Sequence, residues 1–385
     1  MDTSMYDKEI NFIRSLFPGN NKIPLHEPCF PGREKAYVMD AINSTFVSSV
    51  GAYVDKFEDM IIALTGAKSA CATVNGTSAL HAALLAIGVK NKDEVITQPL
   101  TFVGTSNAIR YCGAEPVFID VDKDTLGLSP NALKSFFEKK TIRKNGKTVN
   151  KDTGRVISGC LPVHIFGHPC RIDEIVEVCS DYDVPVVEDC AESLGSRYKD
   201  RHTGRFGTLG VFSFNGNKIV TAGGGGVIIS DDIALGKHLK HMTTTARVAD
   251  GMEFYHDAIG FNYRMPNLNA ALACAQLENL NYFIKNKRRL AMEYNRFFSN
   301  GCEDFFFLTE PADSFSIYWL NTVIAENQKI RNRFIQECHN AGIMTRPAWR
   351  LMNRLKMFEI CQTDALRNAF WLEKRIINLP SSVRI

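Results

Sequence analysis

The sequence predicts an α/β fold in which helices cover both faces of a mostly parallel central sheet, with a smaller α+β domain at the C-terminal end. Between residues 69 and 190, short runs of β-branched and other apolar residues alternate with helical patterns. Such an alternation is typical of a parallel sheet covered on both faces. The 385 residues are enough for one large domain and a smaller one. A long helical pattern at residues 267–298 separates the alternating region from a shorter strand-and-helix pattern.

The expected elements follow one another in a regular order. The strands are expected at residues 69–74, 93–98, 116–121, 156–166 and 184–190. A helix is expected after each of the first four strands, at residues 77–88, 105–113, 128–139 and 171–182. In the small domain we expect a strand at 316–325 and a helix at 330–342. The chain is therefore expected to divide into a large domain with the N-terminal segment, residues 1–265, and linking helices with the small domain, residues 266–385.

The composition argues against several classes of protein. A formal net charge of +3 is nearly balanced and gives no reason to expect nucleic acid or an anionic membrane as partner. The first residues lack a continuous apolar core, and no other segment approaches the roughly 20 apolar residues of a membrane span. The eleven cysteines are scattered without C-x-x-C and the histidines lack H-E-x-x-H, so no metal site is expected. Free thiols in a reducing cytoplasm explain the cysteines most simply.

The residues directly after the expected strands lie at the edge of the sheet where ligands bind in such folds, so they are the first candidates for a site. These residues are Gly76, Thr77, Ser78, Thr101, Phe102, His164, Asp189 and Glu192. Each also has a structural explanation, because residues 75–78 and Asp189 can cap helices, Phe102 can belong to the core, and His164 can be a hydrogen-bonded interior histidine. The functional alternative is that N–H groups at a helix start hold a phosphate, and that Asp189, directly after a buried strand, pairs with a cation.

Lys218 lies in the stretch SFNGNKIVTAGGGGVIIS, which begins at residue 213. The spacing does not match a P-loop, which needs G-x-x-x-x-G-K-[ST], and no G-x-G-x-x-G opens a βαβ unit. A surface lysine beside a loose turn is one interpretation. The apolar residues on both sides favour another, in which Lys218 lies partly out of water and acts as a nucleophile or base.

Together these residue types match the requirements of pyridoxal 5′-phosphate (PLP). PLP needs a seat for its phosphate, an aromatic side chain against its ring, a carboxylate to pair with the protonated ring nitrogen, and a lysine that bonds to its aldehyde and then moves protons. Gly76 with Thr77, Phe102, Asp189 and Lys218 supply these in turn. The sequence therefore predicts PLP as cofactor, with Lys218 and Asp189 as the catalytic residues.

Several stretches resemble the DegT/DnrJ/StrS sugar aminotransferases: NGTSALHAAL from residue 75, TQPLTFVGT from 97, VHIFGHP from 163, VEDCAESLGS from 187, SFNGNKI from 213 with the GGGG after it, and GFNYRMPNLNAA from 260. The resemblance implies PLP fold type I and a homodimer with shared active sites. It implies that Gly76, Thr77 and Ser213 bind the phosphate, together with Asn262 of the second subunit. It further implies that Phe102 stacks on the ring, that Asp189 contacts the ring nitrogen and that Glu192 lies near the ring hydroxyl. Lys218 would be the catalytic base.

The resemblance also suggests the reaction. Relatives that dehydrate sugars carry histidine in place of the lysine, so Lys218 favours transamination. Segments 26–58 and 378–385 resemble the LegC-type branch. This implies that glutamate aminates C4 of a nucleotide-linked 4-keto-6-deoxy-N-acetylglucosamine, with UDP or GDP as the nucleotide, in legionaminic acid and polysaccharide biosynthesis. Enzymes of the bacillosamine or perosamine type are alternatives, and a non-catalytic regulator on the same fold is an alternative of another class.

The expected substrate contacts are His164, Arg346 and Trp349. The bacillosamine-forming relatives share the pattern T-R-P-x-W, found here at residues 345–349. Arg346 can pair with a diphosphate and Trp349 can stack on a sugar or base, although an arginine in a C-terminal domain is more often simply solvated. The basic segment 138–155 favours a solvated, hairpin-like loop, and it would steer a diphosphate only if it lay near the site.

Overall fold

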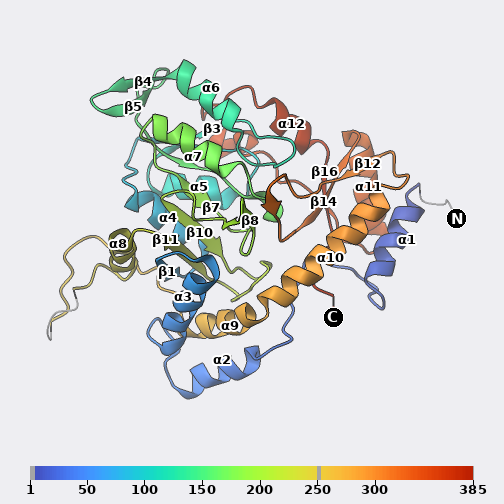
Figure 1. The fold of residues 1–385 in the computed structure, drawn as a ribbon, viewed down its shortest axis with the longest axis horizontal. Helices are drawn as coiled ribbons and strands as arrows, with labels where there is room; N and C mark the ends of the chain where they lie inside the picture. Colours follow the sequence, from blue (N-terminus) through green and yellow to red (C-terminus); the bar gives the residue numbers. More distant parts are fainter. Residues whose placement is uncertain (1–4, 249–252, 385) are drawn as a thin grey trace.

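The computed structural model describes residues 5–248 and 253–384, and its large domain is built on a central sheet (Figure 1). The strands cross the sheet in the order β1 (Ser69–Thr73), β11 (Gly226–Ser230), β10 (Leu209–Ser213), β7 (Val187–Asp189), β6 (Ile157–Leu161), β2 (Glu94–Thr97) and β3 (Glu115–Phe118). Parallel bridges from Cys160 to Val186 and from Val163 to Asp189 join β6 to β7. The other neighbours also pair in parallel, except that β11 is antiparallel to both β1 and β10. The predicted mostly parallel sheet is confirmed.

Helices cover both faces of this sheet, as predicted. On one face lie α4 (Gly76–Ala86), α5 (Val103–Tyr111) and α8 (Ile233–Thr243). On the other lie α6 (Pro130–Lys140) and α7 (Ile172–Asp181), with α2 (Glu34–Asn43), α3 (Ala52–Thr65) and α9 (Asn267–Glu278) beside them. Consecutive side chains of a strand point to opposite faces. Accordingly, Val95 of β2 packs with α4 and α5, whereas Ile96 packs with α6 and α7.

Local capping explains where several helices begin. The side chain of Asn75 accepts a hydrogen bond from the N–H of Ser78 at 2.8 Å at the start of α4. Ser129 accepts from the N–H of Ala132 at the start of α6, where Pro130 occupies the first helical position. Such caps satisfy N–H groups that have no partner inside the helix. Local sequence therefore defines the turn at the start of α4, which forms part of the candidate site, whereas α5 begins without a side-chain cap.

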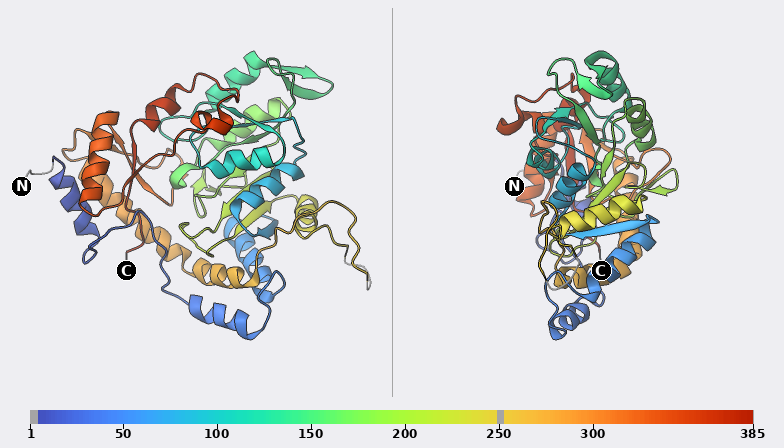
Figure 2. Two further views of the ribbon diagram at one scale, coloured as in Figure 1. Left: turned by 180° about the vertical axis from the view of Figure 1, so that it is seen from behind. Right: turned by 90° about the vertical axis from the view of Figure 1, so that its left-hand side faces the viewer.

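The small domain has an antiparallel sheet in the order β12 (Phe305–Phe307), β14 (Asn321–Ala325), β16 (Ile376–Leu379) and β15 (Arg346–Pro347). Its helices are α11 (Gln328–Asn340) and α12 (Arg367–Glu373), and α10 (Leu280–Phe298) continues from α9 into it (Figures 1 and 2). The strand predicted at 316–325 is shorter than expected. Tyr318 has a φ of 47°, and Ile317 and Leu320 pack in the core shared with the large domain, so regular strand structure begins only at Asn321.

The N-terminal helix α1 (Asp7–Leu16) packs with the small domain. Ile10 and Ile13 from this helix share a core with Tyr294 and Phe334. In Figure 1 the helix lies beside α10 and α11, far from the central sheet. The apolar face of α1 is therefore buried against the C-terminal part of the chain, although the expected division at residue 266 assigned this helix to the large domain.

The remaining elements are short. The basic segment forms the hairpin of β4 (Thr141–Lys144) and β5 (Lys147–Asn150), whose turn residues Asn145 and Gly146 both have positive φ, as hairpin turns favour. A small sheet contains β13 (Ser314–Phe315), β8 (Arg197–Tyr198) and β9 (Arg201–His202), and single 3₁₀ turns lie at η1 (Ile165–Gly167), η2 (Met352–Arg354) and η3 (Lys356–Phe358). Within residues 5–248 and 253–384, every helix is too short or too polar to span a bilayer.

Candidate active site

A cavity of about 320 Å³ lies where β7 and β10 end. Its wall consists of the first turns of α4 and α5, the loops after β7 and β10, and the rings of Trp319 and Trp349 from the C-terminal part of the chain. The predicted site residues that line it are Gly76, Thr77, Phe102, Asp189, Glu192, Ser213, Lys218 and Trp349. The tertiary structure thus brings together residues from four strand ends, as expected for a ligand site in a parallel sheet.

Lys218 lies in this cavity between a carboxylate and an aromatic ring. Its Nζ is 3.3 Å from Oε1 of Glu192 and 4.0 Å from the centre of the Trp319 ring. The Trp319 ring is itself held by a hydrogen bond from its Nε1 to the carbonyl oxygen of Asn217 at 2.8 Å. Only 13% of the Lys218 side chain is exposed. Its amine is therefore held in one place and largely shielded from water.

Asp189 is a buried carboxylate that receives only neutral hydrogen-bond donors. The hydroxyl of Thr105 donates to Oδ2 at 2.8 Å and the N–H of Ala191 donates to Oδ1 at 3.1 Å. Burial raises the pKa of the Asp189 carboxyl, while these hydrogen bonds and the charge of Lys218 oppose the rise. In the described part of the chain Asp189 has no ion pair, because Lys218 pairs with Glu192 instead. A cationic group of a ligand can therefore pair with Asp189.

The start of α4 forms a seat for an anion. The side chain of Asn75 takes the N–H of Ser78, so the N–H groups of Gly76 and Thr77 are left for a ligand. Ser213, at the end of β10, lies directly against this turn: a Cβ at Gly76 would be 2.8 Å from the Cβ of Ser213. The close approach requires glycine at 76 and places the Ser213 hydroxyl beside the helix start.

Phe102 completes the cavity with an exposed aromatic ring. It precedes α5, and 53% of the residue is exposed although it lies among buried neighbours. Its ring centre is 6.3 Å from that of Trp349, at an interplanar angle of 62°. An aromatic face, an anion seat, an unpaired buried carboxylate and a shielded lysine in one cavity fit the phosphate, ring nitrogen and aldehyde of PLP.

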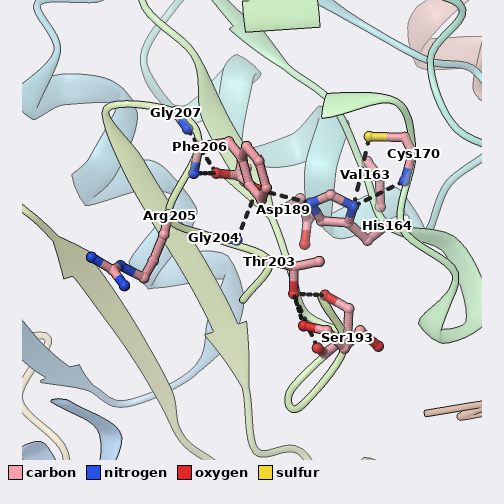
Figure 3. A network of polar contacts seen from close by, with 12 residues as sticks. Val163, His164, Cys170, Asp189, Ser193, Thr203, Gly204, Arg205, Phe206 and Gly207 are labelled. Carbon is pink, nitrogen blue, oxygen red and sulfur yellow. Dashed lines mark hydrogen bonds and ion pairs between the residues drawn. The ribbon is translucent and has the colours of Figure 1, made fainter. Parts of the chain in front are cut away.

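His164 is the predicted substrate residue that the structure contradicts. Its side chain is fully buried, and its Nε2 lies 3.0 Å from Oε2 of Glu188. Its Nδ1 accepts the N–H of Cys170 at 3.2 Å. Both ring nitrogens are thus engaged inside the protein (Figure 3), and His164 is not among the residues that line the cavity, so the prediction that it contacts the substrate is wrong.

Glu188 organises a network behind the cavity. Besides His164, its carboxylate accepts the N–H groups of Gly204, Phe206 and Gly207 at 2.6–2.7 Å (Figure 3). His164, Glu188 and Cys190 are close enough together to hold a metal ion. However, backbone donors already occupy both carboxylate oxygens, so the arrangement has the character of a structural network that fixes the loop before β10.

Arg346 and Asn262 lie outside this cavity. Arg346 lines a second cavity of about 540 Å³, which adjoins the first because Asn217, Trp319 and Trp349 line both. Asn262 is exposed, and its Oδ1 accepts a hydrogen bond from the Arg264 guanidinium at 3.2 Å. Trp349 therefore stands between the two cavities, and Asn262 has no contact with the cavity of its own chain.

Sequence reasoning missed Trp319 and the supporting role of Thr105. Trp319 was part of an expected strand, and nothing in its local pattern indicates that its ring would lie under Lys218. Thr105 belongs to the TQPLTFVGT stretch, but only the pairing of α5 with the end of β7 shows that its hydroxyl holds Asp189. A sequence motif can therefore show which residue type is present, whereas the residue that it hydrogen-bonds comes from a distant segment of the chain.

Comparison with known proteins identifies the family of the chain. Residues 28–385 match the family model described as the DegT/DnrJ/EryC1/StrS aminotransferase family. The chain is 35% identical over 360 residues to the GDP-perosamine synthase of Escherichia coli O157:H7, covering 93% of each chain. It is 34% identical over 363 residues to the GDP-perosamine synthase of Vibrio cholerae, covering 93% of this chain and 94% of the other. The crystal structure of the aminotransferase TlmJ from Streptoalloteichus hindustanus superposes with a TM-score of 0.84 at 24% identity, covering 94% and 93% of the two chains, which shows the same fold.

Proposed function

Because the chain belongs to the DegT/DnrJ/EryC1/StrS aminotransferase family and is thus a PLP-dependent transaminase, we propose that it transfers an amino group to C4 of a nucleotide-linked 4-keto-6-deoxy sugar, with glutamate as donor. The observation that carries the proposal is the position of Lys218 in a cavity that also holds Asp189 and the anion seat. A non-catalytic regulator on the same fold would have no need for the lysine, the buried carboxylate and the anion seat together, so we prefer the interpretation as an enzyme.

The side chains of the cavity divide the work of this reaction. When bound, PLP supplies an electron-withdrawing ring that stabilises the charge left when a neighbouring carbon loses a proton. Nζ of Lys218 would carry that proton between donor and acceptor positions, and Glu192 would keep the amine in place. Asp189 would hold a proton on the ring nitrogen, since none of the cations in the described part of the chain pairs with its carboxylate.

The other residues would bind and orient. The N–H groups of Gly76 and Thr77 and the hydroxyl of Ser213 would hold the phosphate, and Phe102 would lie against the ring. Trp349 and Arg346 border the second cavity, where we place the sugar and the diphosphate of the substrate. The β4–β5 hairpin lines neither cavity, so a steering role for its basic residues has no support from the structure.

Two nucleotide sugars are candidates for the substrate. The GDP-perosamine synthases among the relatives support a GDP-linked 4-keto-6-deoxy sugar, because perosamine carries its amino group at C4. The resemblance of segments 26–58 and 378–385 to the LegC-type branch is the basis for the other candidate, UDP-linked 4-keto-6-deoxy-N-acetylglucosamine, and for a role in legionaminic acid biosynthesis. The relatives favour the first.

We expect the purified protein with PLP and glutamate to aminate the GDP-linked 4-keto-6-deoxymannose at least about 10-fold more efficiently, in kcat/KM, than the UDP-linked N-acetyl sugar. The amino sugars can be quantified by chromatography and mass spectrometry. A preference for the UDP sugar would support the legionaminic acid alternative. Failure to aminate either sugar, or a protein that never acquires the visible absorbance of PLP, would contradict the proposed function.

A homodimer with shared active sites is also part of the proposal. Asn262 is exposed in its own chain, and the neighbouring residues Phe254, Tyr255 and Ile259 are 77%, 61% and 90% exposed. Apolar side chains gathered in this way are typical of a surface that a partner covers. We propose that Asn262 of each chain reaches the anion seat of the other.

Mixed dimers provide a test of this arrangement. If Lys218→Ala and Asn262→Ala each nearly abolish activity, a mixed dimer contains one doubly altered site and one intact site. Exchange of equal amounts makes about half of the dimers mixed, so we expect about a quarter of wild-type activity to return. Subunit exchange is verified by differential tags and native mass spectrometry. Absence of recovery after verified exchange would show that each site is built within one chain.

A further inference from the structure

His26 is a half-buried histidine to which the proposed function gives no role. It lies in the loop between α1 and α2 and lines the second cavity, as does Arg346. Both of its ring nitrogens are buried, and neither forms a hydrogen bond with any part of the chain that the structure describes. Buried polar atoms in folded proteins nearly always have a partner, since an unpaired one is costly. The ring nitrogens therefore lack a partner that a molecule bound in the adjoining cavity would supply.

His26 stands directly beside the reacting end of the site. Its ring centre is 6.3 Å from that of Trp319, at an interplanar angle of 54°. The same indole carries Nζ of Lys218 at 4.0 Å and lines both cavities. A substrate whose reacting carbon lies near Lys218, and whose remainder extends into the second cavity, would therefore share that cavity with His26.

The charges around His26 indicate what kind of group it can bind. Burial and the positive charges of Lys287 and Lys218 together lower the pKa of His26 well below its ordinary value. A neutral imidazole offers one N–H donor and one acceptor nitrogen. This pair suits a hydroxyl or an amide, each of which also donates and accepts, whereas a phosphate is better matched by the guanidinium of Arg346 in the same cavity.

We propose that His26 is a specificity-determining residue that hydrogen-bonds a neutral substituent of the substrate's sugar ring, a hydroxyl or an acylamino group, while the sugar lies beside Lys218. This inference rests on the proposed function. It assigns the two ends of the second cavity to different parts of the substrate, with His26 at the sugar and Arg346 at the diphosphate.

The test measures binding separately from turnover. PLP-loaded protein without amino donor is titrated by calorimetry with GDP-4-keto-6-deoxymannose, which offers hydroxyls, and with UDP-4-keto-6-deoxy-N-acetylglucosamine, which offers an acylamino group. GDP and UDP alone are titrated in parallel. For the better-bound sugar, His26→Phe should weaken binding about 10- to 100-fold, because it keeps a ring against Trp319 but has no polar nitrogen. Binding of the nucleoside diphosphate should stay unchanged, and His26→Gln should restore most of the affinity.

Two controls separate recognition from folding. His168 is matched to His26, because both of its ring nitrogens are also buried without a partner and its ring packs on Tyr318 at 5.1 Å, yet it lines neither cavity. His168→Phe should leave the binding of both sugars unchanged. Retention of PLP by His26→Phe, measured as its visible absorbance before glutamate is added, shows that this variant is folded, because the residues that would hold PLP line the first cavity and are unchanged.

The outcomes distinguish this inference from the proposed function. Equal sugar binding by wild type and His26→Phe, with wild type still aminating one sugar, would overturn the role of His26 alone. An equal loss of affinity for the free nucleoside diphosphate would also overturn it, because the residue would then act on the phosphates or on the fold. If wild type aminates neither sugar, the proposed function fails and this inference fails with it.

Discussion

Substitution of Lys218 by alanine is expected to lower the rate of transamination by about 10²–10⁴-fold or more, because the amine that carries the proton is lost. The structure supports this expectation, since Nζ of Lys218 is held by Glu192 and the Trp319 ring inside the cavity. Steady-state assays with glutamate and the better sugar measure the loss. The phosphate seat and Asp189 remain in this variant, so PLP should still bind, and its absorbance during dialysis reports this binding.

Two further lysine variants define what the amine contributes. Lys218→Arg keeps a positive charge beside Glu192, but a guanidinium does not release its proton near neutral pH, so it should be nearly as inactive as Lys218→Ala. Lys240→Ala is the control outside the site, where Lys240 pairs with Glu58 on the surface at 2.5 Å, and it should keep wild-type activity. Substantial turnover by either Lys218 variant would contradict the role of Lys218 as the proton carrier.

Substitution of Asp189 by asparagine is expected to raise the reaction barrier by roughly 3 kcal/mol, or about 100-fold in rate, by analogy with other preorganised electrostatic groups. The carboxylate is buried and has no cation of its own, so the change removes the negative charge available to a protonated ring nitrogen. Rates of the glutamate half-reaction, followed by PLP absorbance, measure the effect. A rate within a few-fold of wild type would show that Asp189 only holds the turn after β7, where it accepts the N–H of Ala191.

Thr105→Val serves as the matched comparison for Asp189→Asn. It leaves the charge of Asp189 in place and removes only the hydrogen bond to Oδ2, which measures 2.8 Å. We expect a cost of about 1 kcal/mol, or several-fold in rate. If both variants lost the same activity, the orientation of the carboxylate rather than its charge would be the important quantity.

Much of the large domain follows from local sequence. Alternating β-branched runs and helical patterns predicted the parallel strands and the helices between them, and the caps at Asn75 and Ser129 explain where α4 and α6 begin. Lys218 could be identified as a candidate functional lysine from the apolar residues on both sides of it and the glycines after it. These features depend on neighbours within a few residues, which a sequence displays directly.

Other features depend on segments far apart in the chain. The strand expected at 316–325 begins only at Asn321, because residues before it pack against the large domain. Trp319 and His26 come from opposite ends of the chain, and only the folded structure places the first under Lys218 and the second beside it. No periodicity in either segment indicates these contacts.

Two adjacent acids on β7 show this limit most clearly. By itself, the sequence placed Asp189 at the end of a buried strand, and neighbouring residues of a strand, such as Glu188 and Asp189, point to opposite sides. Only the tertiary structure decided which side is the cavity. The loop at 204–207 and His164 form hydrogen bonds with the carboxylate oxygens of Glu188, so His164 has a structural role. Asp189 instead accepts a hydrogen bond from Thr105 and lines the cavity beside Lys218. The physical reason is that a local pattern records whether a side chain is buried, while its partner depends on how distant elements pack around it.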